Sequence, residues 1–461
     1  MNGRPAFARA FAAGMIALAA VCVLAASNVV AAGAETGAAF VSLPHSETEL
    51  GRLNDAGPGL TVAGEPVNVG LLRRFYTSHR FEPIWTSRQA QANLLLNAVL
   101  RAGDHGLAPE LFHANLLRRA TTLSSLEREL LLSDAFLSYA DALARGAMPV
   151  ERRMDDEALT PEPIDIVAVL DAALGSADPA AMIEALAPTT PTYRALRQAL
   201  LSYRSSGQAG ERAMTNRIRQ IEVNLERQRW LPRRLPSERV WVNAADERLV
   251  LYRADRPVFS TRVIVGQDVR VNQTPEFRAT IDAVLYNPPW NIPESITTEE
   301  ILPKLSRDPD YLTRHNMVYR PDGGLQQLPG PNAGLGQLKF EMENRFDVYL
   351  HDTPSKNLFD RDNRRISHGC IRVQNPRELA ALLMQQPIEA ISQAIATGST
   401  TRSNLPSPVP VFVVYQTAFV DIDGTLQFRP DIYNRDLEIW SYLHPVWQPM
   451  ADREPPGQRR G

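Results

Sequence analysis

The chain has almost no cysteine, with only Cys22 and Cys370 among its 461 residues. Cys22 lies in an apolar N-terminal stretch with the layout of an export signal, so we expect Cys370 to be the only thiol of the mature protein. A lone thiol excludes structural disulfide bonds, and the cores must therefore fold by burial alone. Because exported proteins normally pair their thiols or do without them, an unpaired Cys370 is a candidate nucleophile.

Lysine is nearly absent as well, since only Lys304, Lys339 and Lys356 occur among the 49 basic residues. So much arginine beside so much alanine is typical of a bias in coding, and it carries little functional weight. The formal charge of −3 gives no reason to expect a polyanionic partner, and no nucleic acid is expected. Beyond the N-terminal stretch, no segment is long and apolar enough to predict a membrane span.

The first 34 residues predict a secretory signal peptide. Arg4 and Arg9 precede an apolar stretch at about residues 11–26, and Ala32-Gly33-Ala34 is a small-residue site suited to cleavage. The apolar stretch is short for a span of about 20 residues, although an uncleaved membrane anchor is the alternative. We therefore expect an exported protein.

The period of the hydrophobic residues changes near residue 238. Before it, apolar residues recur every three to five positions, as at Ile218, Ile221 and Leu225, which is typical of amphipathic helices. After it, short β-branched or aromatic runs are separated by Asn, Gly and Pro, which is typical of strands. This predicts a multi-domain α+β protein with the following parts: a signal peptide at 1–34, a flexible lead-in at 35–66, a helical domain at 67–235, a mainly-β domain at 236–420 with an insertion at about 294–337, and a C-terminal extension at 421–461, partly disordered from about residue 436.

The segment Ile366-Ser367-His368-Gly369-Cys370-Ile371-Arg372 carries the strongest chemical signal. A thiol is only a few per cent thiolate at neutral pH, so a nucleophilic cysteine needs a base or hydrogen-bond donors beside it. His351 directly follows one predicted strand and Cys370 directly precedes another, so adjacent strands would bring the two together. Gly369 lets the backbone approach a substrate closely, and the N–H groups of Gly369 and Cys370 are natural oxyanion donors.

Other interpretations of these residues stay open. Cys370 alone could be a buried apolar thiol. A zinc site formed by His351, Asp352, His368 and Cys370 is a second alternative, although the spacing matches no usual zinc pattern. Arg372 is either a solvated charge on a strand or a clamp for a carboxylate, which guanidinium binds in a bidentate manner.

Further runs accompany this segment: Val348–Lys356, Asn287–Pro293, Ile301–Leu305, Pro329–Pro331, Gly336–Phe340 and Gln220–Arg227. Together they resemble the L,D-transpeptidases of the YkuD type, in particular the YcbB-like periplasmic subgroup. That family carries an upstream histidine and a downstream Ser/Thr-His-Gly-Cys segment. The resemblance covers most of residues 67–435.

The resemblance implies a helical scaffold domain and a mainly-β catalytic domain, a β-sandwich with short helices and a small lid at 294–337. It implies a periplasmic enzyme of cell wall biogenesis and cell shape whose substrates are peptidoglycan stem peptides. A cysteine thiolate would attack the L-centre carbonyl of diaminopimelate in a tetrapeptide stem and release D-Ala through a thioester. An amine of a second stem would then resolve the thioester as a 3→3 cross-link. Carbapenems would acylate the same cysteine, and neither a metal nor an organic cofactor is expected.

The resemblance also assigns roles to individual residues. Cys370 would be the nucleophile and His351 the general base. The other assignments are: His368 and Ser367 as supporting residues, the N–H groups of Gly369 and Cys370 as the oxyanion hole, and Arg372, Tyr349, Trp290 and Asp352 at the donor-stem site.

Two departures from the family pattern bear on the acceptor. The stretch Ser205–Thr215, where such proteins often carry a peptidoglycan-binding module, is only a short polar linker, and the lid insertion is short. A small lid would admit other acceptors: water, a free D-amino acid, or a protein lysine such as one of an outer-membrane protein. A non-catalytic wall-binding scaffold and a thiol protease are the remaining alternatives.

Overall fold

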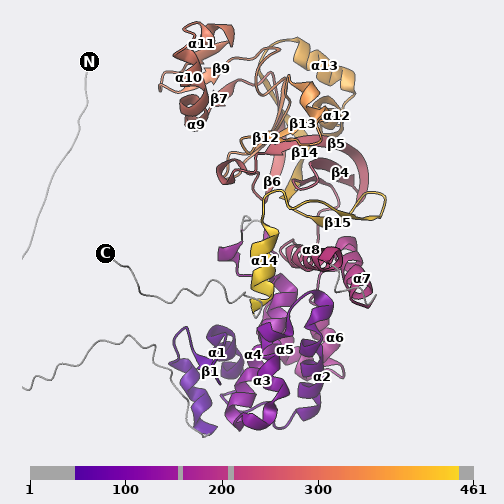
Figure 1. Cartoon of the computed structure of the whole chain (residues 1–461). Coiled ribbons are helices and arrows are strands. Elements are labelled where there is room, and N and C mark those ends of the chain that lie inside the picture. The colour runs from indigo at the N-terminus through magenta and orange to yellow at the C-terminus, as the bar shows by residue number, and fades with distance from the viewer. Residues whose placement is uncertain (1–46, 154–158, 206–211, 446–461) are drawn as a thin grey trace, which may run out of the picture. The chain divides into compact units, whose positions relative to one another are not determined.

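The computed structural model of the chain describes residues 47–153, 159–205 and 212–445, which Figure 1 draws as ribbon. The expected signal peptide at 1–34 lies outside the described residues, as does most of the stretch between Ser205 and Thr215. None of the helices within the described ranges is long and apolar enough to cross a membrane.

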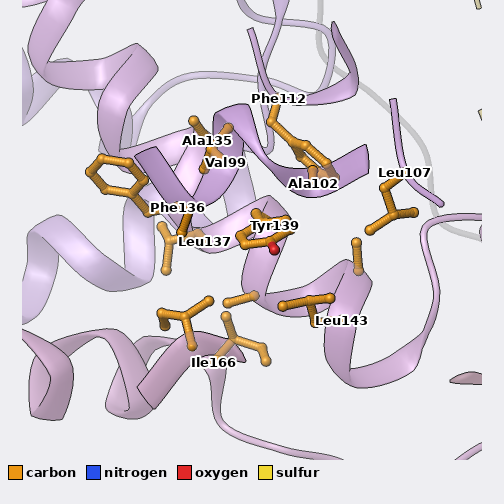
Figure 2. Close-up of a cluster of buried hydrophobic side chains, with 14 of the residues drawn as sticks. Val99, Ala102, Leu107, Phe112, Ala135, Phe136, Leu137, Tyr139, Leu143 and Ile166 are labelled. Atoms are coloured by element: carbon orange, nitrogen blue, oxygen red, sulfur yellow. The ribbon is translucent and has the colours of Figure 1, made fainter. Parts of the chain in front are cut away.

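The N-terminal half is helical, as expected. Its longest helix, α4, begins at a capping box: Ser124 accepts a hydrogen bond from the Glu127 N–H, and the Glu127 carboxylate accepts one from the Ser124 N–H. Figure 2 shows Phe136, Tyr139 and Leu143 of α4 among the buried side chains of this region. The helices are α1 Val69–Ser78, α2 Gln89–Leu100, α3 Ala114–Arg118, α4 Ser125–Arg145, α5 Ile166–Leu174, α6 Pro179–Glu184, α7 Pro191–Ser205 and α8 Arg212–Arg229.

The expected flexible lead-in at 35–66 is wrong for the part that the structure describes. Residues Glu47–Asn54 form a 3₁₀ helix, and β1 Thr61–Val62 pairs with β2 Glu65–Pro66. Leu50 and Leu53 are buried against the helical core, so burial orders a segment whose Gly, Ala and Pro content suggested a linker.

The second half is mainly β, which confirms the expected order of a helical region followed by a β domain. The strands of its main sheet run in the order β12-β5-β13-β11-β10-β6-β14-β3-β4, and β4 also pairs with β5, so the expected sandwich is one sheet closed on itself. Helices α12 Pro376–Met384 and α13 Ile388–Ala396 pack against it. The strands are β3 Arg239–Asn243, β4 Arg248–Arg253, β5 Arg256–Gly266, β6 Phe277–Tyr286, β10 Leu338–Met342, β11 Leu350–His351, β12 Arg365–Ser367, β13 Ile371–Val373 and β14 Thr401–Val414.

The insertion between β6 and β10 is a small body with its own core. Its three strands pair in the order β7-β9-β8, and the buried side chains of Ile292, Ile301, Met317 and Leu325 pack together. Figure 1 shows helices α9–α11 grouped beside these strands. The elements are β7 Trp290–Ile292, α9 Glu294–Ile296, a π-helical turn at Thr297–Ile301, α10 Leu302–Leu305, α11 Tyr311–Arg314, β8 Met317–Tyr319 and β9 Leu325–Gln327.

The C-terminal extension returns to the helices. Strand β15 Ala418–Val420 pairs with β16 Leu426–Phe428, and α14 Asp436–Leu443 packs on α8. The expected partial disorder from about residue 436 is therefore wrong for 436–445, because Ile439, Trp440 and Leu443 are buried in the helical core.

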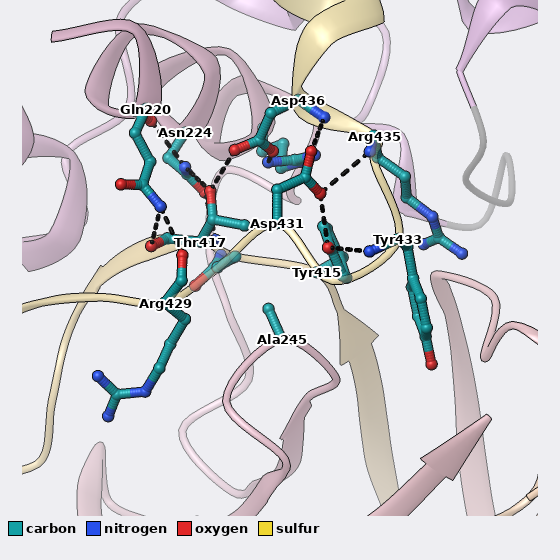
Figure 3. Close-up of polar contacts among 12 residues, drawn as sticks. Gln220, Asn224, Ala245, Tyr415, Thr417, Arg429, Asp431, Tyr433, Arg435 and Asp436 are labelled. Carbon is teal, nitrogen blue, oxygen red and sulfur yellow. Dashed lines mark hydrogen bonds and ion pairs between the residues drawn. The ribbon is translucent and has the colours of Figure 1, made fainter. Parts of the chain in front are cut away.

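A hydrogen-bonded junction joins α8 to this returning segment (Figure 3). The Asn224 amide donates to Thr417 Oγ1 at 2.7 Å and accepts from the Thr417 N–H at 3.0 Å. The Gln220 amide donates to the carbonyls of Thr417 and Arg429, at 3.0 and 2.6 Å. Thr417 Oγ1 in turn donates to Asp436 at 2.8 Å, so this side-chain network fixes the start of the extension and of α14.

We predict that Asn224→Ala destabilises the fold by about 1–3 kcal/mol, because it leaves the buried Thr417 N–H without its acceptor. Urea unfolding followed by circular dichroism would measure the loss. Asn216→Ala is the matched control, since Asn216 is exposed on the same helix and should change stability by less than about 0.5 kcal/mol. Equal effects of the two variants would contradict a stabilising role for the junction.

Candidate active site

Strand alternation places the candidate catalytic residues on one face of the sheet. Strands β11 and β13 pair in parallel with Leu350 opposite Ile371, and both side chains are fully buried in the core. Since successive side chains point to opposite faces, the residues flanking these two take the other face. Tyr349 and His351 on one strand therefore lie beside Cys370 and Arg372 on the next, with His351 opposite Arg372 in the register.

The thiol of Cys370 is partly buried, and its Sγ lies 3.8 Å from the Asp347 carbonyl oxygen. Burial raises the pKa of the thiol above its ordinary value. Hydrogen bonds from the Tyr349 backbone N–H and hydroxyl to the sulfur oppose this rise, as do the positive charges of Lys339 and Arg372. Because burial dominates, the free enzyme holds a thiol at neutral pH, and a base must remove its proton.

Tyr349 connects the sulfur to the lid. The Trp290 side chain, at the start of β7, is hydrogen-bonded to the Tyr349 hydroxyl, and the Lys339 Nζ lies 3.9 Å from the centre of the tyrosine ring. Burial, with the neighbouring Cys370 and Asp347, raises the pKa of Tyr349 well above its ordinary value, so the hydroxyl keeps its proton for donation to the sulfur. Sequence reasoning assigned Tyr349 only to the donor-stem site; its place two residues before His351 was the signal that it shares the face of the nucleophile.

His351 is a buried, neutral imidazole, 4% exposed. Its Nδ1 lies 2.6 Å from the Asp352 carbonyl oxygen, which can only accept, so Nδ1 carries the proton. Burial, together with the charge of Arg372, lowers the pKa of His351 to about 3, although hydrogen bonds to the carbonyls of Asp352 and Leu335 oppose this shift. His351 and Cys370 share this face of the sheet, and no direct hydrogen bond joins them within the described residues.

Ser367 and Gly369 form the tight turn that presents Cys370. The Ser367 hydroxyl donates to the Cys370 carbonyl at 2.6 Å and accepts from the Gly369 N–H at 3.2 Å. Gly369 has φ +111°, which favours glycine, and its carbonyl accepts from Thr274 Oγ1 at 2.9 Å. Because Ser367 occupies the Gly369 N–H, the expectation that this group is an oxyanion donor does not fit the structure, and the Cys370 N–H remains the candidate.

His368 faces the lid instead of the sulfur. Its side chain is exposed, and Nε2 lies 2.7 Å from the carboxylate of Glu300 in the π-helical turn. The contact of His368 thus joins the Ser367–Cys370 turn to the insertion between β6 and β10, and its expected supporting role stays a prediction. This arrangement also separates His368 from the other members of the zinc alternative; the described part of the chain has no cluster of three or more His, Cys, Asp or Glu side chains that could hold a metal.

Asp352 orients the loop before β10. Its carboxylate accepts from the N–H groups of Gln337 at 2.9 Å and Thr353 at 2.7 Å, and from the Lys356 Nζ at 2.6 Å. Gly336 has φ +62°, and a Cβ there would lie 2.5 Å from Asp352. The carboxylate is thus engaged within the protein, so the expectation that Asp352 binds substrate does not fit the structure.

Arg372 is the partly buried cation of the site. Its Nε is buried and has no hydrogen-bond partner among the described residues, a costly arrangement unless a ligand supplies the acceptor. Burial lowers the pKa of the guanidinium, and the nearby Cys370 and Glu300 oppose that shift. These features favour a carboxylate clamp over a solvated strand charge.

Two family models match this chain. Residues 70–200 match the family described as a scaffold domain, and residues 237–411 match the YkuD family, described as the L,D-transpeptidase catalytic domain. A putative L,D-transpeptidase of Haemophilus influenzae is 28% identical over 396 residues, which span 80% of this chain and 78% of that protein.

Two solved structures also match: the carbamoyl enzyme that Ldtfm forms with avibactam, and a cysteine-to-serine mutant of an Enterococcus faecium L,D-transpeptidase. Both are 11% identical and cover 39% of this chain. The match spans 49% and 50% of those two chains, with TM-scores of 0.20 and 0.17.

We predict that the rate constant for acylation of Cys370 does not fall near pH 6.5, the ordinary pKa of histidine. His351, with a pKa of about 3, stays neutral and able to accept a proton down to that pH. The rate constant for carbapenem acylation, followed by intact mass, should stay level between about pH 5 and 8 and rise at alkaline pH as the thiol ionises. The Cys370→Ala variant measures the background decay of the drug. A fall in the acylation rate constant as the pH drops through about 6.5 would contradict a buried neutral His351.

Tyr349→Phe should raise the pKa of the Cys370 thiol, because it removes the hydroxyl that donates to the sulfur. Loss of one hydrogen bond to a charged group corresponds to roughly 10–100-fold slower acylation. Alkylation rate against pH would report the thiol pKa directly. Tyr252→Phe is the control on β4, and a wild-type alkylation profile for Tyr349→Phe would show that the hydroxyl does not act on the sulfur.

Proposed function

We propose, from the premise that this chain is an L,D-transpeptidase with a YkuD catalytic domain, that it forms 3→3 cross-links between peptidoglycan stems. The observation that carries the proposal is the shared face of Cys370, Tyr349, His351 and Arg372 beside the lid. That face offers a nucleophile, a base and a carboxylate site, which are the groups that acyl transfer from a peptide stem requires.

In the acylation step, Cys370 Sγ attacks the carbonyl carbon at the L-centre of diaminopimelate in a tetrapeptide stem. His351 accepts the thiol proton through Nε2, since Nδ1 already carries a proton, and the Cys370 N–H faces the developing oxyanion. The C–N bond to D-Ala then breaks, and the imidazolium returns the proton to the leaving amine. Burial makes protonated His351 a strong acid, which favours this second transfer.

The donor stem is expected to lie under the lid, with a carboxylate on Arg372 and its apolar part against Trp290. The guanidinium supplies a planar pair of donors in a partly desolvated setting, where such pairing is strongest. Glu300 and His368 hold the lid turn against the nucleophile turn. A carbapenem would enter the same space and acylate the same sulfur.

Deacylation by a stem amine gives the cross-link. The same thioester could pass to water, a free D-amino acid or a protein lysine, for instance on an outer-membrane protein, and these acceptors are the alternative form of the proposal. The expected setting is the periplasm, where the enzyme would contribute to cell wall biogenesis and cell shape.

We predict that Cys370→Ala abolishes D-Ala release, cross-linked product and the carbapenem adduct together. Incubation with a disaccharide-tetrapeptide, read by mass spectrometry, would detect a dimer that has lost one D-Ala for wild-type enzyme. A tripeptide alone would identify water as acceptor. Residual D-Ala release by the variant would exclude Cys370 as the nucleophile.

His351→Ala should reduce turnover about 10²–10⁴-fold, the usual contribution of a general base. His368→Ala is the matched histidine control in the same assay, and it should have the smaller effect because His368 contacts the lid. A larger loss for His368→Ala would assign the base to His368 instead.

A further inference from the structure

The nucleophile turn, residues 367–370, is anchored to the segment between β5 and β6 by one buried hydroxyl. Thr274 is fully buried, and its Oγ1 donates a hydrogen bond to the Gly369 carbonyl at 2.9 Å. The same oxygen accepts a hydrogen bond from the Gly266 N–H, also at 2.9 Å. Because Thr274 Oγ1 has a partner for its proton and another for a lone pair, its position and orientation are both fixed.

Anchoring the Gly369 carbonyl also sets the direction of the Cys370 N–H. The two groups belong to one peptide unit, which is planar and trans, so they point in nearly opposite directions. A hydroxyl that holds this carbonyl therefore also holds the Cys370 N–H, the remaining candidate oxyanion donor. An oxyanion donor is effective when it is aimed in advance at the position where charge develops, so its orientation bears directly on the rate of acylation.

Tyr433 of the C-terminal extension holds the backbone on both sides of this hydroxyl. Its own hydroxyl donates to the Gly266 carbonyl at 2.7 Å and accepts from the Thr274 N–H at 3.4 Å. Tyr433 is buried, and burial raises the pKa of its hydroxyl, which therefore keeps the proton that it donates. Gly266 stands opposite Ser367 in the pairing of β5 with β12. Tyr433 thus contacts a neighbour of Ser367 and the anchor of Gly369.

The position of Tyr433 is set by the polar contacts that Figure 3 shows. Its N–H donates to the Tyr415 hydroxyl at 2.8 Å, and that hydroxyl donates to Asp431 at 2.6 Å. The two tyrosine rings stack with their centroids 5.2 Å apart. Arg435 adds a second link, since its guanidinium donates to the Thr274 carbonyl at 3.1 Å. These residues lie beyond residue 411, where the match to the catalytic-domain family ends, so the support comes from outside that match.

We infer that Thr274 is a positioning residue for the oxyanion donor and that Tyr433 of the C-terminal extension holds Thr274 in place. The Thr274 hydroxyl fixes the peptide unit between Gly369 and Cys370, and the Cys370 N–H then points toward the oxyanion of the acylation step. The inference rests on the proposed acyl transfer. It adds that the C-terminal extension contributes to the reaction rate as well as to the stability of the fold.

Two reactions of the same thiol separate this role from general packing. Acylation by a carbapenem or a peptide stem passes through a tetrahedral oxyanion. Alkylation by iodoacetamide forms no oxyanion, because the S–C bond forms at a saturated carbon as the C–I bond breaks and iodide leaves. A misdirected Cys370 N–H should therefore slow acylation and leave alkylation unchanged, whereas a loosened turn would change both rates.

The test compares three variants of the purified enzyme with wild type. Thr274→Val removes the hydroxyl and keeps the shape of the side chain, Thr274→Ser keeps the hydroxyl, and Tyr433→Phe removes only the outer support. Thr261→Val is the matched control, since Thr261 is a buried threonine of β5 whose Oγ1 also accepts from a backbone N–H, that of Asn375 at 3.3 Å. The measurements are carbapenem acylation by intact mass, D-Ala release from a disaccharide-tetrapeptide, and iodoacetamide alkylation as a function of pH.

Thr274→Val should slow carbapenem acylation about tenfold or more, approaching the loss of about 10²–10³-fold that follows removal of an oxyanion donor. For D-Ala release, kcat should fall while KM changes little, because the oxyanion contact is made only in the transition state. Alkylation and its pH profile should match wild type, which also shows that the site is folded. Thr274→Ser should restore most of the acylation rate. Tyr433→Phe should slow acylation about two- to tenfold, as expected for one hydrogen bond.

A wild-type acylation rate in Thr274→Val would overturn the positioning role, and so would an equal fall of acylation and alkylation. If Thr274→Val does not fold, Tyr433→Phe decides in the same assays: slower acylation with wild-type alkylation supports the inference, and any other result overturns it. Failure of wild type to release D-Ala would overturn the proposed function instead. The carbapenem reaction needs no peptide stem, so it would still test the role of Thr274.

Discussion

The chemistry of the site depends on one partly buried cation. Arg372 stands opposite His351 in the register of β11 and β13, and it lies two residues after Cys370 in the chain. Its charge lowers the pKa of His351 and opposes the rise in the pKa of Cys370 that burial causes. The Arg372 guanidinium thus makes His351 a weaker base and Cys370 a stronger acid. Its buried Nε has no hydrogen-bond partner among the described residues, so it can donate to a ligand.

This coupling implies that the donor activates the site. A substrate carboxylate on Arg372 would neutralise the charge that holds the pKa of His351 down, and the imidazole would become a better base when the stem is bound. Lid closure over the donor would also remove water and strengthen the remaining interactions. In the free enzyme, His351 is neutral and Cys370 is protonated, so the thiol is less reactive before a donor binds.

Local pattern was enough to predict the helical and β regions and to place His351 and Cys370 at neighbouring strands. His351 ends β11 and Cys370 directly precedes β13, and alternation along those strands decides which face the two side chains take. The Tyr349–sulfur contact, the engaged Gly369 N–H and the internal role of Asp352 depend instead on strand register and turn geometry, which residue types alone do not specify. The return of α14 to the helical core was missed for a similar reason, because only long-range packing distinguishes a short amphipathic segment from a solvated tail.

The nucleophile turn is held from two sides with unequal strength. On the protein side, Ser367 closes the turn and Thr274 anchors the Gly369 carbonyl, both through buried or partly buried hydrogen bonds. On the lid side, the link is the solvent-exposed pair of His368 and Glu300, and exposed ion pairs contribute little. The shape of the turn therefore depends on the hydrogen bonds of Ser367 and Thr274 more than on its contact with the insertion.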